Sequence, residues 1–189
     1  MSKKLFNYVF ERTEKKYLLS ETKYNKVLKL IQPYMQQDEY GLTTICNIYF
    51  DTESNDLIRR SIDKPIYKEK LRLRSYGIPR ENDNVFLEIK KKWKSTVYKR
   101  RITLSYKESE DYLYRGILLE TKSQIFKEID YFINFYDPQP KLFLAYDRVA
   151  YIGINDSSLR ITFDSNIRSR TDDLHLADGD KGVLFAGVR

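Results

Sequence analysis

The sequence lacks the side chains from which disulfides and zinc sites are built. It contains one cysteine and one histidine among 189 residues. Cys46 has no partner for an internal disulfide, and we expect it to be a small buried residue within the apolar segment TTICNIYF. His175 has no second histidine or cysteine with which to hold zinc, and we expect it at the surface. Disulfide scaffolds and zinc proteins are therefore excluded.

Long apolar segments are also missing. The chain has no run of about 18 apolar residues, the length that crosses a bilayer as a helix. The amino-terminal segment MSKKLFNYVFERTEKKYLL carries charges throughout and has no small-residue cleavage site, unlike a signal peptide. We therefore expect a cytoplasmic protein without a transmembrane segment.

Positive charge is in excess. The 34 Lys and Arg residues against 27 Asp and Glu leave a formal net charge of +7. This balance favours anionic partners such as phosphates, nucleic acid or an acidic surface. The hydrophobic content of 41% can fill the core of one domain, which we expect to span residues 1–189.

The positive charges follow a two-residue period in six segments. In the segment 66–76, Lys68, Lys70, Arg72 and Arg74 alternate with Glu69, Leu71, Leu73 and Ser75. A strand has this period, so the cations project from one face. The same alternation groups Arg12, Glu14 and Lys16, then Glu88, Lys90 and Lys92, then Lys99, Arg101 and Thr103, then Tyr146 and Arg148, and finally Arg160, Thr162, Asp164, Asn166 and Arg168. Such a face can simply meet water, but its concentration of Lys and Arg suits a polyanion better.

The pattern of apolar residues and turn signals predicts a strand-rich chain with four helices. Strands are expected at 8–19, 43–50, 65–77, 84–92, 96–105, 141–155 and 158–169, and another begins in the segment GVLFAG. Helices are expected at 20–35, 53–62, 105–114 and 121–136, with caps supplied by Ser20, Asp51, Thr52 and Ser105.

These elements predict an α+β fold, mainly antiparallel β, in which the sheet closes into a tunnel-shaped β-barrel with helices packed outside. The cationic faces then point inward. Like charges crowded in an interior repel one another unless a ligand neutralises them. The sequence therefore predicts a binding tunnel for a linear polyanion.

Several segments resemble a known family, the VTC (vacuolar transporter chaperone) domain. They are ERTEKKYLL, TTICNIYFD, YKEKLRLRSYG, VFLEIKKK, YKRR, LAYDRVAY and LRITFDSNIR, and the resemblance runs from about Phe10 to Arg170. This domain is the polyphosphate polymerase branch of the triphosphate tunnel metalloenzymes, in the CYTH-like superfamily. The resemblance implies an antiparallel tunnel barrel that binds ATP, triphosphate and polyphosphate with Mn²⁺ or Mg²⁺. It also implies an enzyme that moves the γ-phosphate of ATP onto a growing polyphosphate chain.

The resemblance assigns roles to individual residues. It implies that four cations contact the reacting phosphates: Arg72, Arg74, Lys90 and Arg148. The wider set of expected phosphate-binding residues is Arg12, Lys16, Lys70, Arg72, Arg74, Lys90, Lys99, Arg101, Arg148 and Arg160. Glu14 and Glu88 share the same parity and could either contact a metal ion or pair with neighbouring cations.

The sequence departs from the family pattern in two places. Triphosphatase members begin with Glu-x-Glu-x-Lys, whereas Arg12, Glu14 and Lys16 stand at that spacing here, which favours a polymerase over a hydrolase. The family would also add a strand with a metal-binding glutamate after the last residue, Arg189. We therefore expect missing barrel strands, weak or absent polymerase activity, and an open sheet edge that permits self-association.

Three other functions remain open from the sequence. The domain could be an inorganic triphosphatase or a non-catalytic polyphosphate-binding domain. With 16 tyrosines it could also stack the bases of single-stranded nucleic acid. Nucleic acid is not the expected partner, because most tyrosines, such as Tyr17, Tyr49 and Tyr151, fall on the apolar parity and are expected to pack under helices.

Overall fold

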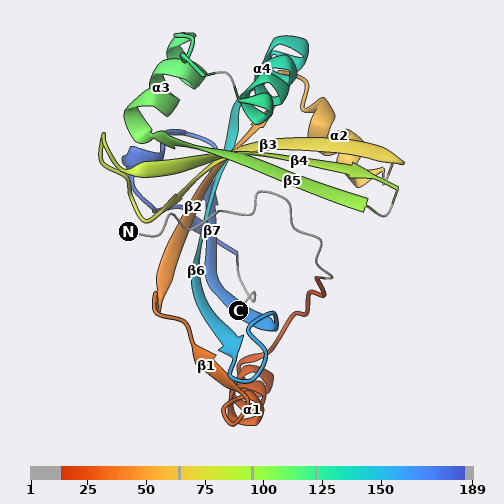
Figure 1. Ribbon diagram of the computed structural model, residues 1–189, viewed down its shortest axis with the longest axis vertical. Helices are drawn as coiled ribbons and strands as arrows, with labels where there is room; N and C mark the ends of the chain where they lie inside the picture. The colour runs from red at the N-terminus through yellow and green to blue at the C-terminus, as the bar shows by residue number, and fades with distance from the viewer. Residues whose placement is uncertain (1–13, 64, 95, 122, 186–189) are drawn as a thin grey trace.

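A computed structural model of the chain describes residues 14–63, 65–94, 96–121 and 123–185. Its strands form one eight-stranded antiparallel sheet in the order β5-β4-β3-β2-β6-β7-β8, with β1 paired to β6 (Figure 1). The strands are β1 (Met35–Gln37), β2 (Thr43–Asp51), β3 (Tyr67–Tyr76), β4 (Asn84–Trp93), β5 (Thr96–Ser105), β6 (Gln139–Gly153), β7 (Arg160–Arg170) and β8 (Val183–Leu184). The helices are α1 (Glu21–Ile31), α2 (Asp56–Ile62), α3 (Tyr106–Arg115) and α4 (Gln124–Tyr136), followed by a 3₁₀ turn at Leu176–Asp178.

The predicted α+β fold, mainly antiparallel, is confirmed. Within the described residues the sheet does not close, because β5 lies at one end of the strand order and β8 at the other. The expected open edge is thus present, and the expected closed barrel is not formed by these strands.

The two faces of the sheet differ sharply. Along β3, Leu71, Leu73 and Ser75 are buried, whereas the intervening Lys70, Arg72 and Arg74 lie on the opposite face. Figure 1 shows α2, α3 and α4 on one side of β3, β4 and β5. We call the side that these helices cover the helical face and the opposite side the basic face.

The core lies between the helical face and α4. Leu71, Leu87 and Ile89 of the sheet have almost no exposed area, and they belong to one cluster with Ile129 and Phe132 of α4. Each such side chain contributes about 1.5–3 kcal/mol by leaving water. This cluster therefore fixes the sheet and leaves its other face to the cations.

Cys46 and His175 were expected in the core and at the surface, and the structure places them in the core and at a partly exposed position. Cys46 is fully buried in this core, as predicted, and burial raises the pKa of its thiol to about 11. His175 is partly exposed, with its Nδ1 atom 2.6 Å from Oε2 of Glu110.

The predicted helix caps are confirmed. Ser105 and Glu108 form a reciprocal capping box at the start of α3. At α2, the carboxylate of Asp51 accepts from the backbone N–H of Leu57 and Ile58, each at 2.9 Å. These short-range signals fix where both helices begin.

The beginning of the chain differs from expectation. Helix α1 ends at Ile31 rather than near Met35 because Pro33 cannot continue it, and Met35 pairs instead with Gly153 of β6. Residues 14–19 are not a strand, and residues 8–13 of that expected strand lie outside the described residues. Tyr17 is 75% exposed and does not pack under a helix as predicted.

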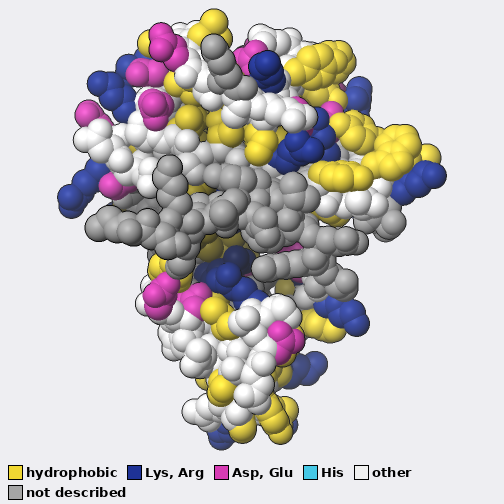
Figure 2. Space-filling model, in the orientation of Figure 1, with side chains coloured by type: hydrophobic (Ala, Val, Ile, Leu, Met, Phe, Trp, Pro, Cys, Tyr) yellow, Lys and Arg dark blue, Asp and Glu magenta, His cyan; other side chains and the backbone are white. Residues whose placement is uncertain are grey.

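Several exposed aromatic side chains lie on α4 and at the neighbouring ends of β3 and β4. Figure 2 shows hydrophobic side chains over α4 and over the neighbouring ends of β3 and β4. Tyr131 and Phe135 of α4 stack at 5.8 Å, and Tyr67 lies 6.1 Å from Trp93 between ring centroids. In the part of the chain that is described, no helix is both long and apolar enough to cross a membrane.

Candidate anion-binding face

Cross-strand pairing places three lysines in one row on the basic face. Lys70 of β3 lies opposite Lys90 of β4, and Lys90 lies opposite Lys99 of β5. Directly opposed residues in antiparallel strands have Cβ atoms about 4.5–5.5 Å apart, and like charges at this separation destabilise a sheet. No carboxylate of the described residues forms an ion pair with these lysines. We call Lys70, Lys90 and Lys99 the lysine row.

The electrostatics of Lys90 reflect this crowding. The pKa of its ammonium group is lowered, first by loss of hydration within the basic face and then by the charge of Lys99. Lys16 and Arg72 lower it further, and Glu14 opposes them. A bound anion would reverse these effects, so the row is arranged to receive negative charge.

The next row on the same face contains Arg72, Glu88 and Arg101, again directly opposed on β3, β4 and β5. Nε of Arg72 donates to Oε2 of Glu88, and Nη1 donates to the hydroxyl of Tyr49 at 3.3 Å. Burial disfavours the charged guanidinium, but Glu88 and Tyr49 outweigh it and raise the pKa of Arg72. Tyr49 therefore lies on the basic face, and the prediction that it packs on the apolar side is wrong.

Arg74 is held by a buried amide. Its Nε donates to Oδ1 of Asn47 at 3.0 Å, and Nδ2 of Asn47 donates to the carbonyl of Leu144 at 3.0 Å. The Asn47 side chain has no exposed area. Nε of Arg74 is also 4.0 Å from Glu88. No role was predicted for Asn47, which is uncharged and lies within the apolar segment TTICNIYF.

Arg148 lies farther along the basic face, on β6. Its guanidinium makes a bidentate pair with Asp164 of β7, at 2.6 and 2.7 Å, and lies 5.1 Å from the ring centroid of Tyr146. Burial raises the pKa of Tyr146. An anion that binds Arg148 must therefore share or displace Asp164.

Arg160 and Lys16, two of the predicted phosphate-binding residues, are not members of these rows, although Lys16 lies close enough to Lys90 to lower its pKa. Arg160 pairs with Asp38 at 3.2 Å and lines a groove of about 380 Å³ beside β1. Lys16 is in an irregular segment, with its side chain 83% exposed and its Nζ atom 3.9 Å from Glu14. Arg12 lies outside the described residues.

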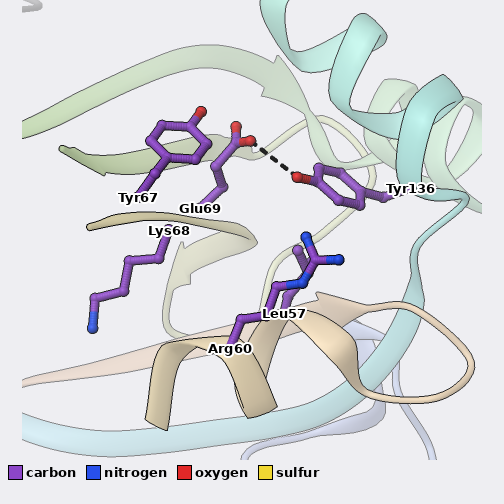
Figure 3. A pocket seen from close by; sticks show the side chains of 6 residues that line it. All are labelled: Leu57, Arg60, Tyr67, Lys68, Glu69 and Tyr136. Atoms are coloured by element: carbon purple, nitrogen blue, oxygen red, sulfur yellow. Dashed lines mark hydrogen bonds between the residues drawn. The ribbon is translucent and has the colours of Figure 1, made fainter. Parts of the chain in front are cut away.

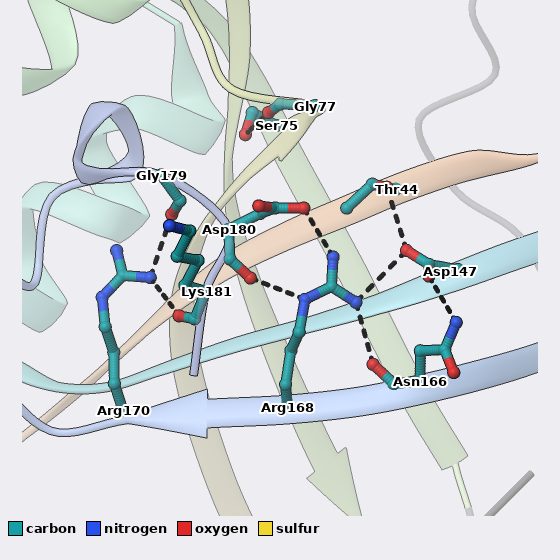
Figure 4. Close-up of polar contacts among 10 residues, drawn as sticks. All are labelled: Thr44, Ser75, Gly77, Asp147, Asn166, Arg168, Arg170, Gly179, Asp180 and Lys181. Carbon is teal, nitrogen blue, oxygen red and sulfur yellow. Dashed lines mark hydrogen bonds and ion pairs between the residues drawn. The ribbon is translucent and has the colours of Figure 1, made fainter. Parts of the chain in front are cut away.

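Arg168 does not share the face of Asp164, contrary to the alternation in the sequence. The register between β6 and β7 shifts between Ala145 and Asp147, and Asn166 has a positive φ of 50°. Beyond this bulge the side chains of β7 change faces. Figure 4 shows the consequence: Arg168 pairs with Asp147 at 3.2 Å and with Asp180 at 2.6 Å.

The predicted metal contacts have the geometry of ion pairs. Glu88 contacts Arg72 and Arg74, and Glu14 contacts Lys16. Across the described ranges, no three His, Cys, Asp or Glu side chains come together in a way that could hold a metal ion. The carboxylates present therefore do not fit a metal site built by the protein alone, and the metal roles of Glu14 and Glu88 stay predictions.

A cavity on the helical face is too small for a polyphosphate ligand. Figure 3 shows a cavity of about 30 Å³ in which the hydroxyl of Tyr136 donates to Glu69 at 3.2 Å. Its other lining residues are Leu57, Arg60, Tyr67 and Lys68. Such a space holds about one water molecule and cannot hold a chain of phosphates.

The fold and the cation rows define a class, an antiparallel β-sheet protein with one face suited to anions. The chain belongs to the VTC domain family, whose model matches residues 11–186. The resemblance drawn from the sequence motifs is thereby confirmed.

Two solved structures are similar in fold. The first is a candidate adenylate cyclase from Bacillus halodurans, with 15% identity, a TM-score of 0.48, and coverage of 78% of this chain and 76% of that one. The second is a candidate adenylyl cyclase from Hippeastrum with a dominant triphosphatase activity, with 15% identity, a TM-score of 0.41, and coverage of 72% and 68%. No curated protein sequence matches the chain significantly. At this level of similarity neither structure assigns an activity to the chain.

Proposed function

We propose that the basic face binds the phosphates of ATP and of a polyphosphate chain, and that the protein transfers the γ-phosphate of ATP to that chain. Membership of the VTC domain family supports this function. The cations assigned from the sequence support it as well, because Lys70, Arg72, Arg74, Lys90 and Lys99 share one face.

The lysine row is the observation that carries the proposal. A sheet that faced only water would gain stability from alternating charges across its strands, and it would lose stability from three opposed lysines. A linear polyanion removes this cost because each phosphate supplies negative charge between neighbouring cations. The adjacent Arg72 and Arg74 offer guanidinium forks that match phosphate oxygens.

Phosphoryl transfer requires the protein mainly to position the two substrates and to neutralise the charge of their phosphates. A terminal oxygen of the polyphosphate chain attacks the γ-phosphorus of ATP, and the bond to the bridging oxygen breaks. Its electron pair leaves with ADP, and the chain becomes one phosphate longer. Aligning both substrates and neutralising their oxygens supplies most of the rate enhancement in such transfers.

The described residues assign no step to a metal ion. Family membership implies Mn²⁺ or Mg²⁺, but the carboxylates of the basic face are engaged with cations. Phosphate binding by Lys and Arg alone should therefore survive a chelator, whether or not turnover does.

Non-catalytic polyphosphate binding is the second candidate. On the described part of the basic face, Glu88 and Asp164 are both paired with arginines, so neither is free to act as a general base. A hydrolase would need such a group to activate water. Release of ADP from ATP only when polyphosphate is present distinguishes transfer from binding and from hydrolysis.

The first experiment is a calorimetric titration of tripolyphosphate into the wild-type protein and into a Lys70→Gln/Lys90→Gln/Lys99→Gln variant. We expect saturable binding by the wild type and a loss of affinity of at least about 100-fold in the variant, because three charge contacts are removed. A Lys26→Gln/Lys29→Gln/Lys127→Gln variant removes the same charge from α1 and α4. An equal loss in both variants would mean that binding depends only on net charge, and the proposal would fail.

A further inference from the structure

The basic face carries aromatic rings as well as cations. Tyr76, the last residue of β3, is 53% exposed, and its ring meets the Phe86 ring edge to face with centroids 5.7 Å apart. Phe86 lies opposite Arg74 on the neighbouring strand, and the guanidinium of Arg101 sits 4.8 Å from its ring centroid. One side of the Phe86 ring system is thus occupied by a cation, while Tyr76 presents open ring surface.

These rings occupy one end of the cation rows. Tyr76 follows Arg74 by two residues on the same face, and it follows Lys70 by six residues, or about 20 Å along a strand. Tyr76 pairs with Ile45, which pairs in turn with Tyr146. The face therefore carries aromatic rings together with Arg148 at the Tyr76 end, and the lysine row lies at the Lys70 end.

The backbone around Tyr76 is fixed from both sides. Gly77, with a φ of 75°, donates its N–H to the carbonyl of Thr44 at 2.8 Å. The hydroxyl of the buried Ser75 donates to the carbonyl of Gly77 at 2.7 Å. With Phe86 against its ring, Tyr76 is held in place before any ligand arrives.

We infer that Tyr76 is the platform on which the base of a nucleoside triphosphate stacks, while its phosphates extend past Arg74 toward the arginine and lysine rows. This rests on the proposed function and adds how the site distinguishes its two substrates. A polyphosphate chain has no flat ring and uses the cations alone. A nucleotide uses the cations and Tyr76.

The stacking surface favours no particular base strongly. Every base has a π-face, and aromatic stacking accepts all of them. Arg148 and Tyr40 lie close enough to Tyr76 to interact with it electrostatically, but among the described residues its ring contacts the Phe86 ring and its side chain makes no hydrogen bond. ATP and GTP should therefore bind with similar affinity, and both should bind more tightly than a phosphate chain of equal length.

The test compares ATP with tripolyphosphate on the Tyr76→Ala, Tyr76→Leu and Tyr76→Phe variants, by calorimetric titration of the whole chain without metal. We expect Tyr76→Ala and Tyr76→Leu to weaken ATP binding about tenfold and to leave tripolyphosphate binding unchanged. Tyr76→Phe keeps a ring and should bind ATP like the wild type. Tyr131→Ala removes a tyrosine of similar exposure from α4 and should change neither affinity.

Each other outcome overturns the inference. Equal losses for ATP and tripolyphosphate would mean that Tyr76 supports the phosphate site or the fold rather than a base. Unchanged ATP binding in Tyr76→Ala would mean that no base rests there, and loss in Tyr76→Phe would assign the effect to the hydroxyl. Tighter binding of single-stranded DNA than of ATP, lost in Tyr76→Ala, would make the platform a nucleic-acid contact. Failure of the wild type to bind tripolyphosphate would instead refute the proposed function.

Discussion

Among single residues, Glu88 decides how the arginines of the basic face are presented. Its carboxylate accepts a hydrogen bond from Nε of Arg72 and lies 4.0 Å from Nε of Arg74. One carboxylate therefore orients both guanidinium groups through their Nε atoms. Among the described residues, the hydrogen bond and the ion pair of Arg74 involve only Nε, so its two Nη atoms are available to a ligand there. An incoming phosphate therefore meets forks that are already aligned.

Lys90 should give phosphate binding a distinctive pH dependence. Its pKa lies below that of a free lysine, about 10.4, so it loses its proton at a lower pH than a free lysine does. Tripolyphosphate affinity should therefore decline between neutral pH and about pH 10, and Lys90→Arg, which keeps its charge, should decline less. Titrations across this range measure both profiles, with Lys127→Arg on α4 as the matched control.

The same depressed pKa has a consequence for the free protein. The unfolded chain binds more protons at Lys90 than the folded chain in this alkaline range, so this residue's contribution to stability rises with pH. If the affinity for tripolyphosphate had the same pH profile in the wild type and in Lys90→Arg, the role of Lys90 in binding would be contradicted.

Charged residues of the site could be predicted from the sequence, and their neutral partners could not. The two-residue period puts Lys70, Arg72 and Lys90 on one side of their strands, regardless of which strands pair with them. Asn47 and Tyr49 carry no charge and lie in an otherwise apolar segment. Their roles depend on the register between β2 and β3, which alternation within one strand does not determine.

Among the elements, strand β7 contributes charged side chains to both faces of the sheet because of its bulge. Asp164 points to the basic face and pairs with Arg148, whereas Arg168 points to the helical face. Asn166 stands between them in a left-handed conformation, and its side-chain amide donates to Asp147 at 2.9 Å.

Asn166 should therefore resist replacement by a β-branched residue. Asn166→Val forces such a side chain into the left-handed region and should lower the free energy of unfolding by about 2 kcal/mol or more. Asn166→Gly accepts the backbone and loses only the contact with Asp147, about 1 kcal/mol. Urea unfolding of both variants measures the difference, and a larger loss for glycine would show that the bulge does not depend on this conformation.

Elements with a sustained pattern were predicted almost to the residue, and short or irregular ones were not. The predicted strand at 96–105 coincides with β5, and the capping box locates the start of α3. Strand β1 has three residues, too few to show a period, and exists because Met35 pairs with β6. The bulge at Asn166 could not be predicted because it arises from pairing between β6 and β7.

For the whole molecule, the sheet presents two edges of different character in the described residues. Strand β8 has two residues, while β5 has ten and carries Lys99, Arg100 and Arg101 in succession. Positive charge along an edge strand opposes pairing with another chain. Self-association through this edge, expected from the sequence, stays a prediction.

The positive charge of the β5 edge predicts that salt promotes self-association of the protein and weakens its binding of tripolyphosphate. Screening weakens the repulsion between the β5 edges of two copies, so the average mass in sedimentation equilibrium should increase from low to high salt at fixed protein concentration. Tripolyphosphate binding should weaken over the same range, because there the charges attract. A mass that is constant or falls with salt would exclude association through β5.

The regular spacing of the cation rows has a kinetic consequence. Successive rows, from Lys70 to Arg72 to Arg74, are two residues or about 7 Å apart along β3. After a displacement of one row, a polymer of identical charged units again meets a cation of β3, so registers that differ by one row keep this contact. If the proposed transfer takes place on this face, the repeat of β3 cations favours lengthwise sliding of the polyphosphate chain without detachment, and therefore several transfers to one chain before its release.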